Sequence, residues 1–462
     1  MNLAAWNTGI DAASPRSPAA IGRWLLWVGG AGMLLGIFLT PPWGLFGIAL
    51  AIIGVCLARP PILRLPVVWV GVAFGAWILA GNLAGWLRDQ PGCGRISSPA
   101  YSWLAIPLTA AAAADPRWRR IVLRLLVGVG AVAVLVSLLQ FTIGIGEGPL
   151  RIDPAGRRFN ISRGFSAYHL SFGFACAILA ALCVPASLIG TGWLWAGRII
   201  GLTGIAISGA RACMLGGTAA FAAALAARGG RWLLAAAGVA ILLGGLLLAR
   251  MAVSDPGRLR SMLAGQDGRL PIWQVTAVMI GERPLLGIGS RDAFKLAWNE
   301  TYARVAPGPP NEFGPTGGCP HAHNWLLAVA AEFGIPAALL HLAVVLTVLV
   351  LLWRRREESP EAFQAGCGVA VAALVCAVFE PLPTMAAPGM GFHAALGYVL
   401  GKSYGARPEL TSTQGLVENP VLRPGEPTVT YGDPHERGPD DATLRARGSR
   451  LDDDELARKL RP

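Results

Sequence analysis

Long apolar runs are the feature of this sequence that most limits its fold. Ile121–Gly144, Trp232–Val253 and Ala328–Trp353 are each long enough to cross the roughly 30 Å hydrocarbon core of a bilayer as a helix. The composition agrees, because 54% of the 462 residues are hydrophobic, 14% are charged, and the mean hydropathy is +0.51. These values exclude a water-soluble globular protein.

Apolar windows along the chain predict an all-α polytopic membrane protein with about 12 transmembrane helices. The expected spans are 22–40, 43–58, 66–86, 101–115, 121–144, 165–186, 188–208, 212–227, 232–252, 325–353, 363–380 and 386–402. The domain plan is a cytoplasmic N-terminus (1–21), spans 1–9 (22–252), a large outer loop (253–324), spans 10–12 (325–402) and a polar, disordered cytoplasmic tail (403–462).

The formal charge of +12 follows this membrane plan and does not indicate nucleic-acid binding, because the Lys and Arg residues do not gather on one soluble domain. With the N-terminus inside, the inner connections are Arg-rich, as the positive-inside rule requires. Two outer segments, 145–163 and 253–324, are nevertheless basic. An anionic ligand such as phosphate explains this charge, and so does contact with lipid headgroups; both explanations stay open.

Within the large loop, Gly268–Gly281 is expected to form an amphipathic helix, and the Pro- and Gly-marked Pro284–Gly289 a turn. Arg211 stands between two apolar segments that almost no loop separates. Because a guanidinium stays charged, it must meet water, a carboxylate or a phosphate. Small neighbours such as Gly216 favour a ligand site, whereas snorkelling to the interface is the alternative.

His321, His323 and Asn324 end the loop where the tenth span begins. An imidazole there can accept a proton near neutral pH, and a helix N-terminus can bind an anion. A plain interfacial role is the alternative. The two histidines do not have the spacing of a zinc motif, and no Cys/His cluster completes a metal set, so no metal is expected. Glu380, at the outer end of the eleventh span, is expected either to cap its helix or to orient a ligand.

Several motifs in order resemble the O-antigen ligase and polymerase family of bacterial polysaccharide assembly. They are Ser208-Gly-Ala-Arg211, Arg269-Leu-Pro-Ile-Trp273 leading to Pro284-Leu-Leu-Gly-Ile-Gly289, and His321-Ala-His-Asn-Trp325 leading to Glu332-Phe-Gly-Ile-Pro336. With the looser match near Arg163, the resemblance extends from about Arg163 to Pro336. Each motif alone would be weak, and their order and spacing carry the resemblance.

The resemblance implies a GT-C-like helical glycosyltransferase of the inner membrane, with its active site on the periplasmic side and the large loop between spans 9 and 10. Its donor would be an undecaprenyl-diphosphate glycan, and its acceptor lipid A-core (ligase) or another lipid-linked glycan (polymerase). No metal, nucleotide or other cofactor is implied. Arg211 and Arg269 would hold the diphosphate, and His323 would activate the acceptor hydroxyl.

Four further residues are assigned to substrate binding: His321, Asn324, Arg158 and Arg163. Of the two histidines, His323 is preferred as the base because it directly precedes Asn324 at the helix start. The segment beginning at Arg163 resembles the family only loosely and is expected to contact the donor. A transporter or flippase for a polysaccharide precursor is the main rival, since it also needs about a dozen spans and a basic cavity.

Overall fold

The computed structural model describes a large part of the chain, in several stretches. The described residues are 17–39, 41–93, 96–143, 150–152, 158–160, 165–166, 169–185, 190–229, 238, 245, 269–305, 319 and 321–405. The chain divides into two compact units, Met1–Pro408 and Glu409–Pro462. The second unit, which holds most of the expected cytoplasmic tail, lies outside the described residues, and so does the expected N-terminal segment up to residue 16.

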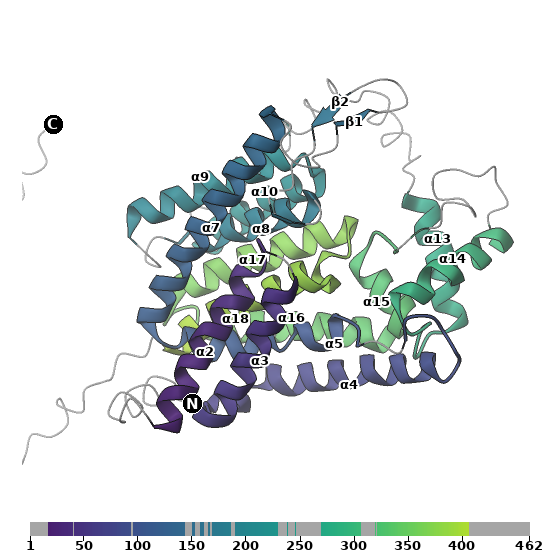
Figure 1. The fold of residues 1–462 in the computed structure, drawn as a ribbon, viewed down its shortest axis with the longest axis horizontal. Helices are drawn as coiled ribbons and strands as arrows, with labels where there is room; N and C mark the ends of the chain where they lie inside the picture. Colours follow the sequence, from purple (N-terminus) through teal and green to yellow (C-terminus); the bar gives the residue numbers. More distant parts are fainter. Residues whose placement is uncertain are drawn as a thin grey trace, which may run out of the picture. The chain divides into compact units, whose positions relative to one another are not determined.

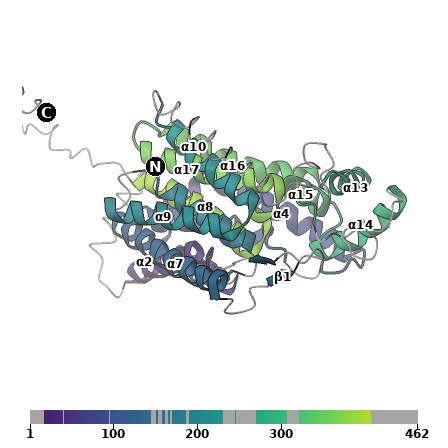
Figure 2. The same ribbon diagram turned by 90° about the horizontal axis from the view of Figure 1, so that it is seen from above.

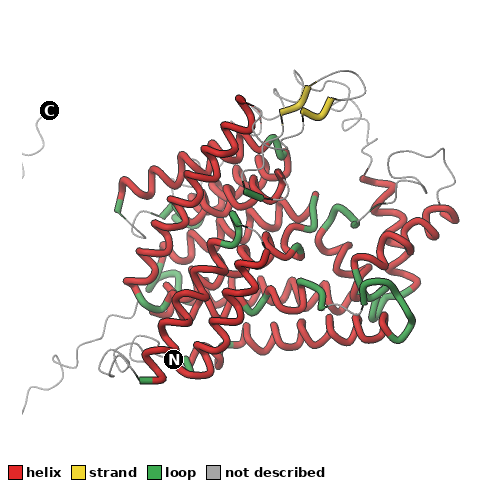
Figure 3. Tube along the Cα trace, viewed as in Figure 1, coloured by secondary structure: helices red, strands yellow, loops and turns green. Residues whose placement is uncertain are grey.

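The first unit is built almost entirely of helices (Figure 3). In chain order its elements are α2 (Pro18–Leu35), α3 (Pro41–Ala58), η1 (Pro61–Arg64), α4 (Pro66–Trp86), α5 (Pro99–Ser102), α6 (Ala105–Ala113), α7 (Pro116–Ile143), β1 (Leu150–Ile152), β2 (Arg158–Asn160), α8 (His169–Leu182), α9 (Thr191–Ser208), α10 (Arg211–Ala226), α13 (Arg269–Glu282), α14 (Arg291–Val305), α15 (Trp325–Phe333), α16 (Ile335–Arg354), α17 (Pro360–Phe379), η2 (Leu382–Thr384) and α18 (Ala386–Gly405).

Five of the described helices, α2, α4, α7, α16 and α17, are long and apolar enough to cross a membrane. Shorter apolar helices include α3, α8 and α10. The chain is therefore a helical membrane protein. The expected span at 101–115 is instead divided between α5 and α6, and the nine residues of α6 are too few to cross a bilayer. Apart from Gly238 and Gly245, the expected span at 232–252 lies outside the described residues.

Two short strands modify the expected all-α fold. In segment 145–163, which is predicted to face outside, β1 and β2 pair antiparallel, with Arg151 opposite Phe159 (Figure 3). The strands were not expected, because strands of three residues are too short to show a reliable alternation of polar and apolar positions.

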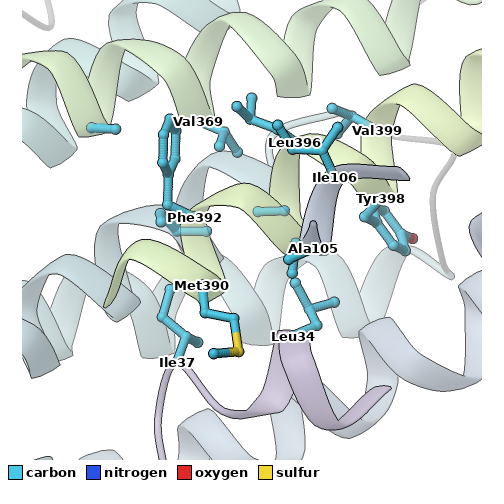
Figure 4. Packing of buried hydrophobic residues seen from close by; sticks show 14 of the residues in the cluster. Leu34, Ile37, Ala105, Ile106, Val369, Met390, Phe392, Leu396, Tyr398 and Val399 are labelled. Atoms are coloured by element: carbon cyan, nitrogen blue, oxygen red, sulfur yellow. The ribbon is translucent and has the colours of Figure 1, made fainter. Parts of the chain in front are cut away.

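Helix α18 lies at the centre of the apolar core and is buried along almost its whole length. Figure 4 shows Phe392 and Leu396 of this helix among apolar side chains from α2, α6 and α17. Gly397 permits the close approach of α6, because a β-carbon there would lie 2.4 Å from the carbonyl oxygen of Ile106. Small residues at such contacts let membrane helices pack backbone to backbone.

The expected tenth span, 325–353, is not one continuous helix. It breaks at Gly334 into α15 and α16, because Gly334 has φ +87° and Pro336 follows within the first turn of α16. A β-carbon at Gly334 would collide with the carbonyl of Leu285. Only glycine fits this close approach, so the Phe-Gly-Ile-Pro sequence encodes the break.

The segment Pro284–Ser290 passes over this break, and we call it the strap. Its Ile288 and Gly289 amides donate to the carbonyls of Ala331 (3.0 Å) and Glu332 (2.7 Å), near the end of α15. In return, the Ile335 amide donates to Pro284 (2.8 Å). Two motifs that lie about 45 residues apart in the sequence are thus one hydrogen-bonded unit.

The strap also joins α4 and fixes the position of two outer helices. Trp77 of α4 donates its indole N–H to the carbonyls of Leu285 and Phe333, each at 3.2 Å. On either side of the strap, α13 and α14 pack against α15 at one end of the helical bundle (Figures 1 and 2). Helix α13 confirms the helix expected at 268–281.

Helix α14 was not expected from the sequence. Its signals are Ser290, whose hydroxyl accepts the Ala293 amide at 3.2 Å, and the buried Phe294, Trp298 and Tyr302 at four-residue intervals. These aromatic residues form a second apolar cluster with α13 and α15. That cluster holds the first residue of α13 beside the membrane-spanning bundle.

Candidate functional site

The loop that leads into α15 is held by a helix cap. Asn324 is the N-cap residue: its side-chain oxygen accepts the Leu327 amide at 3.1 Å. Its side-chain amide donates to the carbonyl of Val378 at 3.3 Å, in the last turn of α17. Asn324 therefore fixes the start of α15 against the end of α17. Directly before it, His323 has a left-handed backbone with φ +49°.

Glu380 lies at the junction of three elements. It ends α17, is 7% exposed, and places Oε1 3.2 Å from Nδ1 of His323. The same oxygen is 3.6 Å from Nη2 of Arg269. One carboxylate therefore connects an imidazole from the α15 loop with a guanidinium from α13. Glu380 is also the C-cap residue of α17, with its backbone N–H donating to the Cys376 carbonyl, so the capping position expected from the sequence is present, and a role in orienting a ligand stays a prediction.

Arg269 is the first residue of α13. Its guanidinium carbon lies 5.3 Å from the centroid of the Phe379 ring, which is a cation–π distance, and the side chain is 26% exposed. Phe379 and Glu380 are neighbours at the end of α17. The guanidinium is thus held on two sides by α17 while part of it faces outward.

Arg211 is the first residue of α10 and lies at the same end of the bundle. Gly209, with φ +66°, ends α9 and makes possible the very short connection to α10. Just inside α10, the Cys213 thiol donates to the Leu170 carbonyl in α8 (3.3 Å), and Cys376 of α17 donates to the Ala212 carbonyl (3.3 Å). Cys376 is one turn before Glu380, so the start of α10 lies beside the end of α17.

His321 differs from His323 in both burial and bonding. Nδ1 of His321 accepts the backbone N–H of His323 at 3.3 Å, and the residue is 8% exposed. Burial first, and then the electrostatic effect of the neighbouring His323 and Arg291 side chains, lower the pKa of His321 to about 3. His321 is therefore neutral at physiological pH and supports the loop, whereas the side chain of His323 is 21% exposed.

Three possible metal ligands do come together. The ligand atoms of His321, His323 and Glu380 lie within 4.8 Å of one another, a set that the sequence did not indicate because Glu380 is 57 residues beyond His323. Two contacts favour a hydrogen-bonded group over a cation site. His323 and Glu380 are already at hydrogen-bond distance, and Arg269 brings a positive charge to the same carboxylate oxygen.

The structure gathers most of the residues expected from the sequence. His321, His323, Asn324 and Arg269 meet around Glu380, and Arg211 heads the adjacent helix. Arg163 lies outside the described residues. Arg158 belongs to β2, and its side chain lies outside them too. Cys93 and Cys319, the two loop cysteines, are both free and buried.

Comparison with known families agrees with this arrangement. Residues 196–342, about a third of the chain, match the family model described as O-antigen ligase. This part of the chain, residues 196–342, is assigned as an O-antigen ligase domain. The match confirms the family resemblance seen in the sequence, and it includes Arg211, Arg269 and His323, whereas Glu380 lies beyond its end. No curated protein matches the chain.

The O-antigen ligase domain and the apolar helices establish the general class of the protein. It is a multi-pass membrane protein with a glycan-transfer role in polysaccharide assembly, of the ligase or polymerase type. The family assignment favours transfer over the transporter considered above, since transport is not the activity by which this family is described.

Proposed function

We propose that this protein transfers a glycan from an undecaprenyl-diphosphate donor to a saccharide acceptor at the periplasmic face of the inner membrane. The acceptor is lipid A-core for a ligase, or another lipid-linked glycan for a polymerase. The observation that carries the proposal is the contact of one buried carboxylate, Glu380, with both His323 and Arg269. It brings a base and a diphosphate-binding cation together at one end of the bundle.

His323 is the proposed general base. Glu380 lies at Nδ1, so the proton of neutral His323 is held there and Nε2 is the nitrogen that accepts a proton. A sugar hydroxyl is a weak nucleophile until its proton is removed. As Nε2 takes that proton, the acceptor oxygen forms a bond to the anomeric carbon and the bond from that carbon to the diphosphate oxygen breaks. Direct displacement inverts the anomeric configuration.

Arg211 and Arg269 are proposed to bind the leaving diphosphate. Its negative charge grows as the glycosidic bond breaks, and two fixed guanidinium groups can stabilise it in place of a metal ion. Each arginine is the first residue of its helix, where the backbone N–H groups and the helix dipole also favour the binding of an anion. Removing one arginine is expected to raise the barrier by about 2–4 kcal/mol.

The test is to delete the gene and analyse surface polysaccharide together with lipid-linked intermediates. Complementation then compares the wild type with Arg211→Ala and His323→Ala at matched membrane levels. Long chains on the lipid carrier with bare lipid A-core would identify a ligase, and single repeat units on the core would identify a polymerase. Neither variant is expected to restore the wild-type glycans.

Two outcomes would contradict the proposal. Normal glycan transfer by either variant would remove that residue from the mechanism. Unchanged glycans after deletion, or precursors trapped on the cytoplasmic side, would contradict transfer altogether and support the transporter.

A further inference from the structure

A second group of linked side chains lies inside the bundle, next to the proposed active site. The indole N–H of Trp325 donates to Nδ1 of His341 at 2.9 Å, and Nε2 of His341 lies 3.1 Å from Nε2 of His393. The three residues come from α15, α16 and α18. Both histidines are fully buried and Trp325 is 2% exposed. We call Trp325, His341 and His393 the inner chain.

The direction of hydrogen bonding in the inner chain is fixed by chemistry. An indole nitrogen is only a donor, so Nδ1 of His341 must be the acceptor. Neutral His341 then carries its proton on Nε2 and donates it to Nε2 of His393. His393 in turn carries its proton on Nδ1. Each residue therefore has one defined tautomer and one defined orientation.

This direction excludes one role and favours another. A proton relay from the active site would have to pass through Trp325, whose nitrogen cannot accept a proton. The chain can instead fix geometry. The Trp325–His341 bond joins α15 to α16 across the break at Gly334, and the Phe74 ring stacks on His341 with centroids 4.5 Å apart.

We propose that His341 is a positioning residue that holds Trp325, and through it the start of α15, in the geometry that places His323 at Glu380. Trp325 is the first residue of α15. It directly follows the Asn324 cap and is two residues after His323. Burying two imidazoles in an apolar bundle costs free energy, and a function in fixing the start of α15 explains why they are present there. The inference rests on the proposed role of His323.

The first experiment uses two substitutions that each mimic half of an imidazole. In His341→Asn, the side-chain oxygen lies near the position of Nδ1 and can still accept the Trp325 N–H. In His341→Gln, the side-chain amide reaches the position of Nε2 and can still donate to His393. The Asn variant should keep turnover within about threefold of the wild type, whereas the Gln variant should lose about tenfold or more in kcat, since small displacements of a reacting group are expensive.

The second experiment removes the indole donor. Trp325→Phe keeps an aromatic ring at the start of α15 but has no N–H. It should lower kcat about tenfold and leave KM for the lipid-linked donor near the wild-type value, because Arg211 and Arg269 are untouched. Trp118→Phe is the matched control: it also removes a buried indole hydrogen bond, to the Trp27 carbonyl at 2.9 Å, in a part of the bundle that carries no proposed site residue. It should leave kcat unchanged.

Hydrogen exchange supplies a readout that does not depend on activity. The Leu327 and Ala328 amides, which bond to Asn324, should exchange faster in Trp325→Phe and His341→Gln than in His341→Asn or the wild type. Wild-type kcat and exchange in both Trp325→Phe and His341→Gln would overturn the proposal. An equal loss in His341→Asn and Trp118→Phe would also overturn it, since that pattern indicates general packing.

Failure of the proposed function gives a different result. If His323→Ala kept normal turnover, the base assignment would be wrong, yet the exchange rates would still show whether the inner chain fixes the start of α15.

Discussion

The outer group of His321, His323 and Glu380 and the inner chain of Trp325, His341 and His393 use the same side chain in opposite ways. In the outer group, His323 is partly exposed and meets a carboxylate that also faces a guanidinium. In the inner chain, both histidines are fully buried and bond to neutral groups. In the sequence, only Asn324 separates His323 of the outer group from Trp325 of the inner chain. The neighbours of an imidazole, more than its sequence position, decide whether it is suited to proton transfer or to fixing a helix.

The largest expected effect is that of removing His323, the proposed base of the outer group. His323→Ala should lower the rate of glycan transfer by about a hundredfold to ten-thousandfold, the usual contribution of a general base. His321→Ala should cost less than about tenfold, because His321 only supports the loop. Initial rates with purified lipid-linked donor in proteoliposomes test both variants. Equal losses would show that the two histidines cannot be separated in this way.

Removing the charge of Glu380 should have the next largest effect. In Glu380→Gln the side-chain amide can donate to Nδ1 of His323 and so place the imidazole proton on the wrong nitrogen. We expect kcat to fall by roughly tenfold to a hundredfold while the protein stays folded. Glu282→Gln, which removes the carboxylate of an exposed ion pair with Arg304, is the control. Unchanged kcat in Glu380→Gln would exclude Glu380 as an orienting group.

The outer group also predicts a pH dependence of stability. Because the pKa of His321 is about 3 in the folded protein and about 6.5 when unfolded, the unfolded chain binds more protons between these values. The free energy of unfolding therefore falls as pH drops from 6.5 toward 3. His321→Gln should lose about 2–3 kcal/mol less than the wild type between pH 7.5 and 4.5. Denaturant titration in detergent at both pH values measures this, and identical losses would refute it.

The smallest expected effect is that of metal removal. Although His321, His323 and Glu380 could hold an ion, Arg269 already faces the same carboxylate. A chelator should therefore leave the transfer rate unchanged. A loss of activity that returns on addition of Zn²⁺ would instead show that the outer group is a metal site.

The helical membrane fold and most of the candidate site residues could be predicted from the sequence. Apolar runs report directly on membrane helices, and His323, Arg269 and Arg211 lie in motifs with recognisable order. The contacts of Glu380 with His323 and Arg269 could not be predicted. Glu380 is 57 residues after His323, and no sequence motif relates the two residues. Only the packing of α17 against α10 and α15 brings it there.

The inner chain shows a different limit of sequence reasoning. His341 lies within an apolar run, which predicts a buried helix residue, and it is buried. Its partners Trp325 and His393 lie 16 and 52 residues away on other helices, so no local pattern predicts the bonds. Similarly, the largely apolar segment 325–353 suggested one span, although it breaks at Gly334. Gly334 and Pro336 are the local signal for this break, but the contact of Gly334 with the strap is not visible in the sequence.

The left-handed backbone of His323 has a consequence for evolution and design. Arg59 and Asp89, the other two described non-glycine residues with positive φ, follow helix ends, where such caps are common, whereas His323 precedes a helix. A β-branched or ordinary side chain there carries strain of about 1–2 kcal/mol, which glycine would relieve. Selection for thermal stability alone would thus favour glycine and remove the imidazole that is proposed as the base. At this position, a thermostabilised variant and an active one require different residues.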